Sequence, residues 1–236
     1  MNVIGDSEGN LDSILKLINK MPDDETILLG DIIDRGPKSK ETIEWAMNSD
    51  VEVLLGNHEH MFIDHILGQR MYEPGMWFQV GGDATMESYG LYAEGHYYGK
   101  NHGDETLIKH LEWLQKRPVI KYINGFVLTH APINFRVPLE QTIDPNRLNH
   151  GESVIWNRDE PAKIDGVIQL FGHNSNWGLK YFNEVIDPNA RPSFGAKPKS
   201  QSDKPAWAIC LDTSRKRVIT GINTKTMEIF QEDHVK

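Results

Sequence analysis

Three short apolar runs in the first sixty residues each lead into a glycine followed by a polar side chain. They lie at residues 3–4, 26–29 and 51–55. Runs of this kind, bounded by turn residues, are typical of strands buried in a parallel sheet. Between the runs, apolar residues recur with helical spacing at 11–18 and at 39–47, which predicts two helices. Strands joined in this way by helices predict a right-handed parallel β-α-β-α-β layer.

The middle of the chain predicts a helical cap at about residues 71–116. A helix is expected just before it, from about 59 to 68, on the spacing of its apolar positions. Residues 71–103 are rich in glycine, tyrosine and tryptophan and lack a clean period, which indicates short elements with tight turns. A further helix is expected to follow, with leucines at 107, 111 and 114 on one face.

The second half of the chain predicts more strands. Residues 119–123 and 126–128, separated by Asn-Gly, predict a hairpin, and 167–171 predicts another strand. Residues 187–205 contain many Pro, Lys, Ser and Asn residues, and we expect a long loop there. Strands with antiparallel pairing are expected at 206–211, 217–222 and 227–230.

Composition narrows the class of protein. With 236 residues the chain can form one well-buried core, and no linker divides it, so we expect a single domain over residues 1–236. No apolar run is long enough to span a bilayer, and the first residues enter a strand without a leader, so a cytoplasmic protein is expected. The single cysteine, Cys210, excludes an internal disulfide framework. The net charge of -9 does not indicate a general nucleic-acid or membrane surface, and we expect a monomer.

Polar residues follow each of the first three predicted strands. Asp6 follows the first, Asp31 the second, and Asn57 and His58 the third. Because loops past the carboxyl ends of parallel strands meet at one edge of a sheet, these side chains are expected to converge. Each alone would be ordinary turn chemistry, but three within sixty residues favour a metal site. Asp31 is expected to bridge two metals, because its strand lies between the other two.

Two of these segments resemble a known family. Gly-Asp-Ile-Ile-Asp-Arg-Gly at 30–36 and Gly-Asn-His-Glu at 56–59 look like the second and third blocks of the calcineurin-like metallophosphoesterases, in the phosphoprotein-phosphatase branch. Phage lambda-type protein phosphatases look most similar, and bacterial diadenosine tetraphosphate hydrolases share the same blocks. Residues 77–85 also resemble a cap segment of bacterial members. The resemblance implies an α/β fold, a four-layer α-β-β-α sandwich of two mixed sheets flanked by helices.

The resemblance also implies a reaction and a set of site residues. Two divalent cations, Mn before Mg, Fe, Co or Zn, would generate a hydroxide for in-line attack on a phosphoester. His58 would protonate the leaving alkoxide and Asp34 would orient it, while phosphate would be held by Arg35, by Asn57 and by Arg158 of a Trp-x-Arg-like block. Arg158 has the alternative of an ordinary surface ion pair. The implied metal ligands are Asp6, Glu8, Asp31, Asn57, His130 and His173.

Glu8 departs from the family pattern. The first block of the family is Asp-x-His, whereas this chain has Asp6-Ser7-Glu8. A carboxylate in place of the imidazole would favour Mn or Mg over Zn. Alternatively, Glu8 points away and leaves the site one ligand short.

Three functions remain open at this point. The first is a phosphatase acting on phosphoserine or phosphothreonine proteins or on small phosphoesters. The second is a hydrolase of dinucleoside polyphosphates or nucleic-acid ends, with the 187–205 loop and its lysines at 197, 199 and 204 contacting substrate. The third, motivated only by Glu8, is a non-catalytic binding protein on a degraded phosphatase scaffold.

Overall fold

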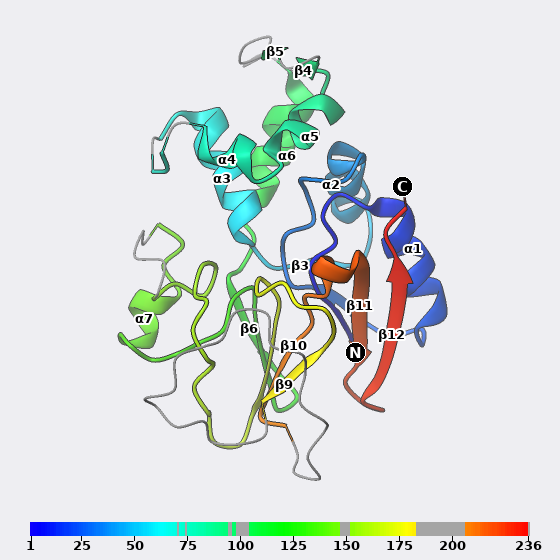
Figure 1. Cartoon of the computed structure of the whole chain (residues 1–236), viewed down its shortest axis with the longest axis vertical. Coiled ribbons are helices and arrows are strands. Elements are labelled where there is room, and N and C mark those ends of the chain that lie inside the picture. The colour runs from blue at the N-terminus through cyan, green and yellow to red at the C-terminus, as the bar shows by residue number, and fades with distance from the viewer. Residues whose placement is uncertain are drawn as a thin grey trace.

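Two mixed β-sheets lie face to face, with a helical cap at one end of the pair (Figure 1). This computed structural model describes residues 1–69, 71–73, 75–93, 96–97, 104–146, 152–182 and 206–235. The loop expected at 187–205 lies outside the described residues, and so do its lysines and cap residues 94–95 and 98–103.

The first sheet contains the predicted parallel layer. Its strand order is β12-β11-β1-β2-β3, and β1, β2 and β3 run parallel, with β2 in the middle as expected. Ile4 pairs with Leu28, and Leu28 with Val53, so the three strands end at the same edge. The strands are β1 (Asn2–Ile4), β2 (Thr26–Leu28), β3 (Glu52–Val53), β11 (Val218–Asn223) and β12 (Glu228–Asp233).

The second sheet has the order β6-β7-β8-β10-β9. The predicted hairpin is β6 with β7. Antiparallel pairing in the last third holds for β11 with β12 and for β10 with β9, but β10 also pairs parallel with β8. The strands are β6 (Ile120–Ile123), β7 (Phe126–Thr129), β8 (Ile168–Phe171), β9 (Lys180–Phe182), which was not predicted, and β10 (Ala208–Cys210).

Apolar side chains from the facing sides of the two sheets form the central core. The strands alternate, so every second residue of each buried strand points inward. From the first sheet the core contains Val3, Ile27, Leu29 and Leu54, and from the second Phe126, Leu128, Leu170 and Ile209. Cys210 is buried on the other face of the second sheet, as a small apolar side chain.

Helices cover the outer face of the first sheet. Helix α1 (Leu11–Lys20) lies along β11 and β12 in Figure 1, with Ile14 and Leu17 buried. Helix α2 (Ser39–Met47) has the predicted bounds, whereas α3 (Asn57–Leu67) begins two residues earlier than expected. The early start places Asn57 and His58 in the first helical turn.

The cap is helical, as predicted. It contains α4 (Met76–Gln79), α5 (Gly82–Ser88), the short pair β4 (Tyr92–Ala93) and β5 (His96–Tyr97), and α6 (Glu105–Leu114). The three leucines expected on one face of α6 are buried. Figure 1 shows this cap above the two sheets, with α3 leading into it.

The predicted fold class is confirmed. On the outer side of the second sheet, Val127 belongs to one apolar cluster with Val154 and with the residues beneath the cap. The described parts of residues 131–167 contain one short helix, α7 (Leu139–Thr142). A 3-10 turn, η1 (Ser214–Lys216), precedes β11. No helix in the described part of the chain has the length and apolarity needed to span a bilayer.

Candidate metal centre

Both sheets deliver polar side chains to one shared region. Asp6, Asp31 and Asn57 follow β1, β2 and β3, and His130 and His173 follow β7 and β8 of the other sheet. All five are buried, with at most 5% of the residue surface exposed. The structure therefore brings together the polar residues that the sequence placed at separate strand ends.

A buried pocket is formed by two imidazoles, an amide and a carboxylate. Oδ1 of Asn57 lies 2.9 Å from Nε2 of His130 and 2.9 Å from Nδ1 of His173. The two imidazole nitrogens are 3.2 Å apart, and Oδ1 of Asp31 is 3.3 Å from Nε2 of His130. Asp31, His130 and His173 are three potential metal ligands. In the described chain, their ligand atoms all lie within 4.8 Å of one another.

Backbone carbonyls fix which nitrogen of each imidazole faces the pocket. Nδ1 of His130 donates to the carbonyl of Leu29 at 3.0 Å, and Nε2 of His173 donates to the carbonyl of Trp156 at 3.1 Å. The remaining nitrogen of each neutral ring therefore presents a lone pair to the pocket. Together with Oδ1 of Asn57 and Oδ1 of Asp31, four acceptor atoms converge, and Oδ1 of Asp31 also accepts the backbone N–H of His58 at 3.1 Å. Acceptors packed in this way require a proton or a cation between them, so these residues fit a divalent metal.

The electrostatics of the pocket also favour positive charge. Burial opposes charging of His130, but the Asp31 carboxylate raises the pKa of His130 to about 9. Burial likewise acts against ionised Asp31, yet His130 and His58 lower the pKa of Asp31 below its ordinary value. Burial, His130 and Arg158 lower the pKa of His173, so this ring is held neutral, as a metal ligand must be.

Asp6 lies beside this pocket and contacts its backbone. Both carboxylate oxygens accept the His173 N–H, each at 3.1 Å. Burial and the nearby carboxylate of Asp212 raise the pKa of Asp6 well above its ordinary value. Asp212, itself buried, was not singled out from the sequence, because it follows β10 at the far end of the chain.

Glu8 is turned toward an arginine. One of its carboxylate oxygens forms an ion pair with Nη1 of Arg35, and the other lies 3.8 Å from Nδ1 of His234 near the C-terminus. In the described chain the Glu8 carboxylate is thus paired with Arg35 and does not belong to the group formed by Asp31, His130 and His173.

His58 and Asp34 form the expected pair. Nδ1 of His58 bonds to Oδ2 of Asp34, which is fully buried and also accepts from Nε1 of Trp77 at 2.7 Å and from the Thr85 hydroxyl. Nε2 of His58 faces Oδ2 of Asp31 at 3.8 Å. Burial would lower the pKa of His58, but Asp31 and Asp34 raise it above its ordinary value. The tryptophan and threonine were seen in the sequence only as cap residues, and their role in holding Asp34 was missed.

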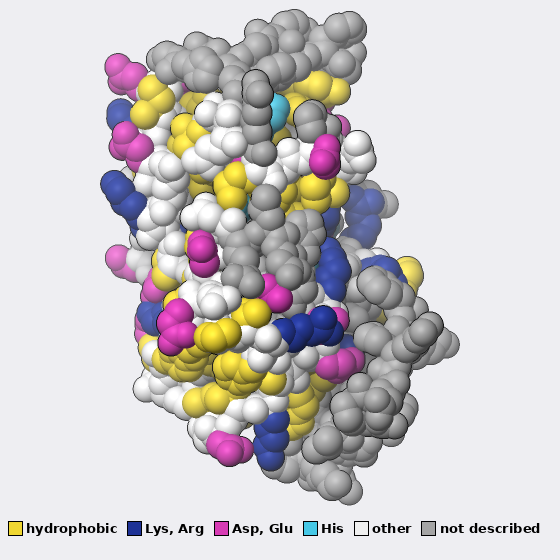
Figure 2. All heavy atoms as spheres, turned by 90° about the vertical axis from the view of Figure 1, so that its left-hand side faces the viewer, with side chains coloured by type: hydrophobic (Ala, Val, Ile, Leu, Met, Phe, Trp, Pro, Cys, Tyr) yellow, Lys and Arg dark blue, Asp and Glu magenta, His cyan; other side chains and the backbone are white. Residues whose placement is uncertain are grey.

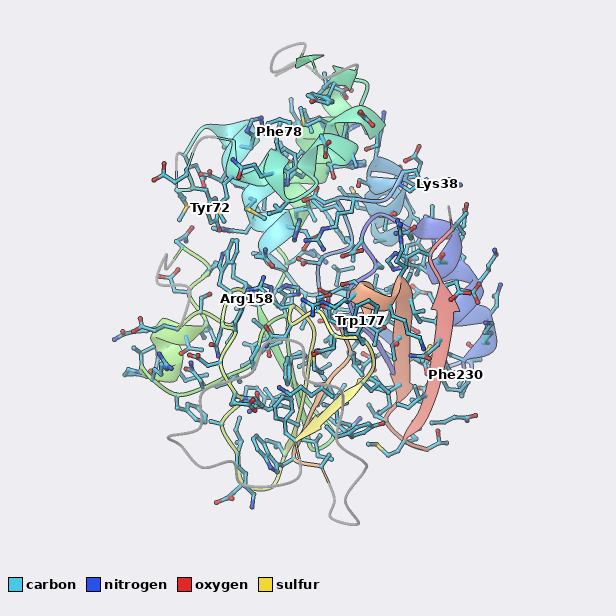
Figure 3. The ribbon with its side chains drawn as sticks, viewed as in Figure 1. Lys38, Tyr72, Phe78, Arg158, Trp177 and Phe230 are labelled. Carbon is cyan, nitrogen blue, oxygen red and sulfur yellow. The ribbon has the colours of Figure 1, made fainter. Side chains whose placement is uncertain are left out.

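The two arginines lie on the solvent side of the pocket. Arg35 donates from Nε to the carbonyl of Val80 at 3.0 Å, and its Nη2 lies 3.2 Å from Nε2 of His58; its side chain is 43% exposed. Arg158 is exposed and donates to the carbonyl of His173 at 3.4 Å. Figure 3 places Arg158 between the cap and the second sheet, in the middle of the molecule. Two guanidinium groups thus lie where an anion approaching the pocket would meet them.

Glu59 holds the turn after β2 and was also missed. Its carboxylate accepts the backbone N–H groups of Asp31, Ile32 and Gly56, each at 2.9 Å. Burial and the Asp31 carboxylate raise the pKa of Glu59 to about 7. A glutamate at the third position of a helix is a capping-box signal, and that pattern could have identified it.

Several site residues have left-handed backbone conformations although none of them is glycine. Such φ values cost side chains roughly 1 kcal/mol or more and persist only where surrounding contacts enforce them. The backbone of these turns therefore sets the direction in which the side chains of the site project. The residues are Glu8 (φ 50°), Asp31 (φ 49°), Asp34 (φ 70°), Arg35 (φ 61°) and His173 (φ 62°).

Two curated proteins resemble this chain in sequence. The symmetrical bis(5'-nucleosyl)-tetraphosphatase of Methylobacillus flagellatus is 32% identical over 146 residues, which is 59% of this chain and 46% of that protein. The protein of the same description from Vibrio parahaemolyticus is 27% identical over 164 residues, 65% of this chain and 54% of the relative. The chain thus spans about half the length of the curated relatives it matches.

The fold has solved counterparts. The crystal structure of a metallophosphoesterase from Sphaerobacter thermophilus superimposes with a TM-score of 0.51 over all of this chain and 89% of the other, at 13% identity. The profile of the calcineurin-like phosphoesterases matches residues 2–199. The expected resemblance is therefore confirmed, and the chain belongs to the calcineurin-like phosphoesterase family.

Proposed function

We propose that this chain is a metal-dependent hydrolase of phosphoric esters and anhydrides, with dinucleoside polyphosphates as the first substrate class to test. The observation that carries the proposal is the buried convergence of four acceptor atoms from Asp31, Asn57, His130 and His173. The substrate class is supported by the two relatives, which are both described as symmetrical bis(5'-nucleosyl)-tetraphosphatases. It replaces phosphoproteins as the first substrate to test.

A divalent cation in this pocket would polarise phosphoryl oxygens and lower the pKa of water, which is the chemistry that hydrolysis requires. Mn is the first ion to test, because the pocket mixes imidazole nitrogens with hard oxygens. The protein's part is positioning. Arg35 and Arg158 can bind the non-bridging oxygens of a phosphoryl group, with Asn57 beside them.

His58 can supply the proton for the departing oxygen. Its Nδ1 is bound to Asp34, so the exchangeable position is Nε2, which faces Asp31 and Arg35. General acid catalysis matters most for alkoxide leaving groups, which are strong bases, and less for nucleoside diphosphates.

Phosphomonoesters are the second candidate substrates, because their alkoxide leaving groups need a proton from a general acid. A buried acid, positioned by a carboxylate and aimed at the pocket, is suited to a leaving group that must be protonated. The location of Arg158 also fits the phosphate-binding role implied by the Trp-x-Arg-like segment. The surface gives no preference for a polyanionic macromolecule on the face shown in Figure 2, where basic and acidic side chains are interspersed.

The test compares three substrates with purified protein loaded with Mn, Mg, Co or Zn. Diadenosine tetraphosphate, a phosphoserine peptide and a chromogenic phosphomonoester are incubated with it, and products are separated by ion-exchange chromatography. We expect the tetraphosphate to be split, with symmetrical cleavage giving two nucleoside diphosphates. Asp31→Asn should be inactive, and Asp12→Asn, a partly exposed acid paired with Lys38, should serve as the matched control. If none of the three substrates is hydrolysed with any of the metals, the proposal is overturned in favour of a binding protein.

A further inference from the structure

The ligands for a second metal ion are not assembled in the way that the family pattern implies. That position would use Asp6, Asp31 and the residue at position 8. In the described chain, the group of potential ligands within 4.8 Å of one another contains Asp31 but neither Asp6 nor Glu8. At that position the residue where the family has histidine is Glu8, and its carboxylate is paired with Arg35.

The two oxygens of Asp31 face different surroundings. Oδ1 lies beside His130 and accepts the backbone N–H of His58, so it belongs to the metal pocket. Oδ2 lies 3.8 Å from Nε2 of His58, and the same nitrogen is 3.2 Å from Nη2 of Arg35. Oδ2 of Asp31 is therefore on the side of the arginine.

Arg35 is held in this position from three directions. Glu8 pairs with Nη1, Nε donates to the carbonyl of Val80, and Nη2 lies 3.2 Å from Nε2 of His58. Burial acts to lower the pKa of Arg35. The negative charges of Glu8, Asp31 and Asp6 outweigh burial and raise this pKa. Its positive charge thus lies among the carboxylates that a second metal would need.

We propose that this chain binds one metal ion tightly, and that the guanidinium of Arg35, fixed by Glu8, provides the second positive charge beside Asp31. The inference rests on the proposed function for the metal pocket itself. Glu8 is then a positioning residue for Arg35 rather than a metal ligand. A histidine at position 8 could bind a metal but could not neutralise the arginine, whereas the glutamate forms an ion pair with it.

The test is the number of metal ions bound, which needs no substrate. Protein stripped with a chelator is titrated with Mn(II) by calorimetry, and the loaded protein is analysed for metal after gel filtration. We expect one tightly bound Mn(II) per chain and the paramagnetic resonance spectrum of an isolated ion. Glu8→Gln should leave this number unchanged, because the side chain is not a ligand. Glu8→His restores the family block and should add a second ion with a spectrum showing exchange coupling.

Different outcomes separate this inference from the proposed function. Two tightly bound ions in the parent, or a fall from two to one in Glu8→Gln, would overturn the inference and leave the hydrolase proposal standing. Binding of no metal to the parent would overturn both. Thermal unfolding of both variants identifies any loss of fold, and in that case the stoichiometry of the parent chain alone decides.

Discussion

The imidazole of His58 is bonded through Nδ1 to a carboxylate, Asp34, that has no exposed surface. Asp34 also accepts hydrogen bonds from Trp77 and Thr85 in the cap, so the acid that orients the imidazole is itself fixed by a different part of the chain. The bond sets the tautomer of His58 and leaves Nε2 as the position at which a proton is gained or lost.

Asp34→Asn should shift the pH dependence of hydrolysis. Burial opposes the charged form of His58, whereas Asp31 and Asp34 raise its pKa, so loss of the Asp34 charge lowers that pKa. Turnover that requires protonated His58 falls as the pH rises through this pKa. The alkaline limb of the kcat profile on an alkyl phosphate should therefore move to lower pH. An unchanged limb would remove Asp34 from this role.

His58→Asn should lower turnover on an alkyl phosphate by about 10² to 10⁴, the usual scale for loss of a general acid. Metal content, measured by elemental analysis, should stay that of the parent. The loss should be smaller for an activated leaving group, which needs no proton. His60→Asn, two residues along α3 and bonded to Tyr72, is the matched control. Equal activity of the His58 variant and the parent on the alkyl phosphate would contradict the assignment.

Asp31→Asn should abolish tight metal binding. The variant removes the carboxylate charge that favours a cation in the pocket. Because a ligand that binds only the folded chain stabilises it, chelation should lower the Tm of the parent. The same treatment should leave the Tm of Asp31→Asn unchanged. A variant with the metal content of the parent would exclude Asp31 as a ligand.

Gly172→Ala tests the close approach of two loops without removing a polar group. An added Cβ at this position would collide with Oδ1 of Asp6, which is bonded to the neighbouring His173 N–H. We expect destabilisation of about 1–3 kcal/mol together with weaker metal binding. Gly178→Ala is the control, since nothing lies within 4 Å of its added Cβ. Denaturant unfolding and metal titration measure both effects, and equal behaviour of the two variants would refute the packing argument.

The sequence predicted the elements whose patterns are local. The spacing of apolar residues gave the bounds of α2, and glycine after each strand located Asp6, Asp31 and Asn57. Their convergence follows from one rule about parallel strands, which the register of Ile4 with Leu28 bears out. Strand β9 begins at Lys180 and lacks the apolar run that marked β1 and β2, which are equally short, so it was not predicted.

Contacts between distant segments could not be predicted in the same way. Glu8 meets Arg35 and lies near His234, and no local pattern indicates which of two side chains a carboxylate will face. The hydrogen bond from Trp77 to Asp34 crosses 43 residues and depends on how the cap lies on the sheet. Such pairings are set by tertiary packing, and a propensity for helix or strand carries no information about them.

The left-handed backbone conformations at Asp31, Asp34, Arg35 and His173 cost the protein stability. Selection for stability alone would therefore act against keeping these residues. Glycine adopts these φ values without steric cost, so replacing an exposed one such as Arg35 relieves backbone strain while removing a guanidinium. A library of this protein screened only for resistance to heat or protease would accumulate glycine at such turns. Its most robust members would be folded proteins with no chemistry left in them.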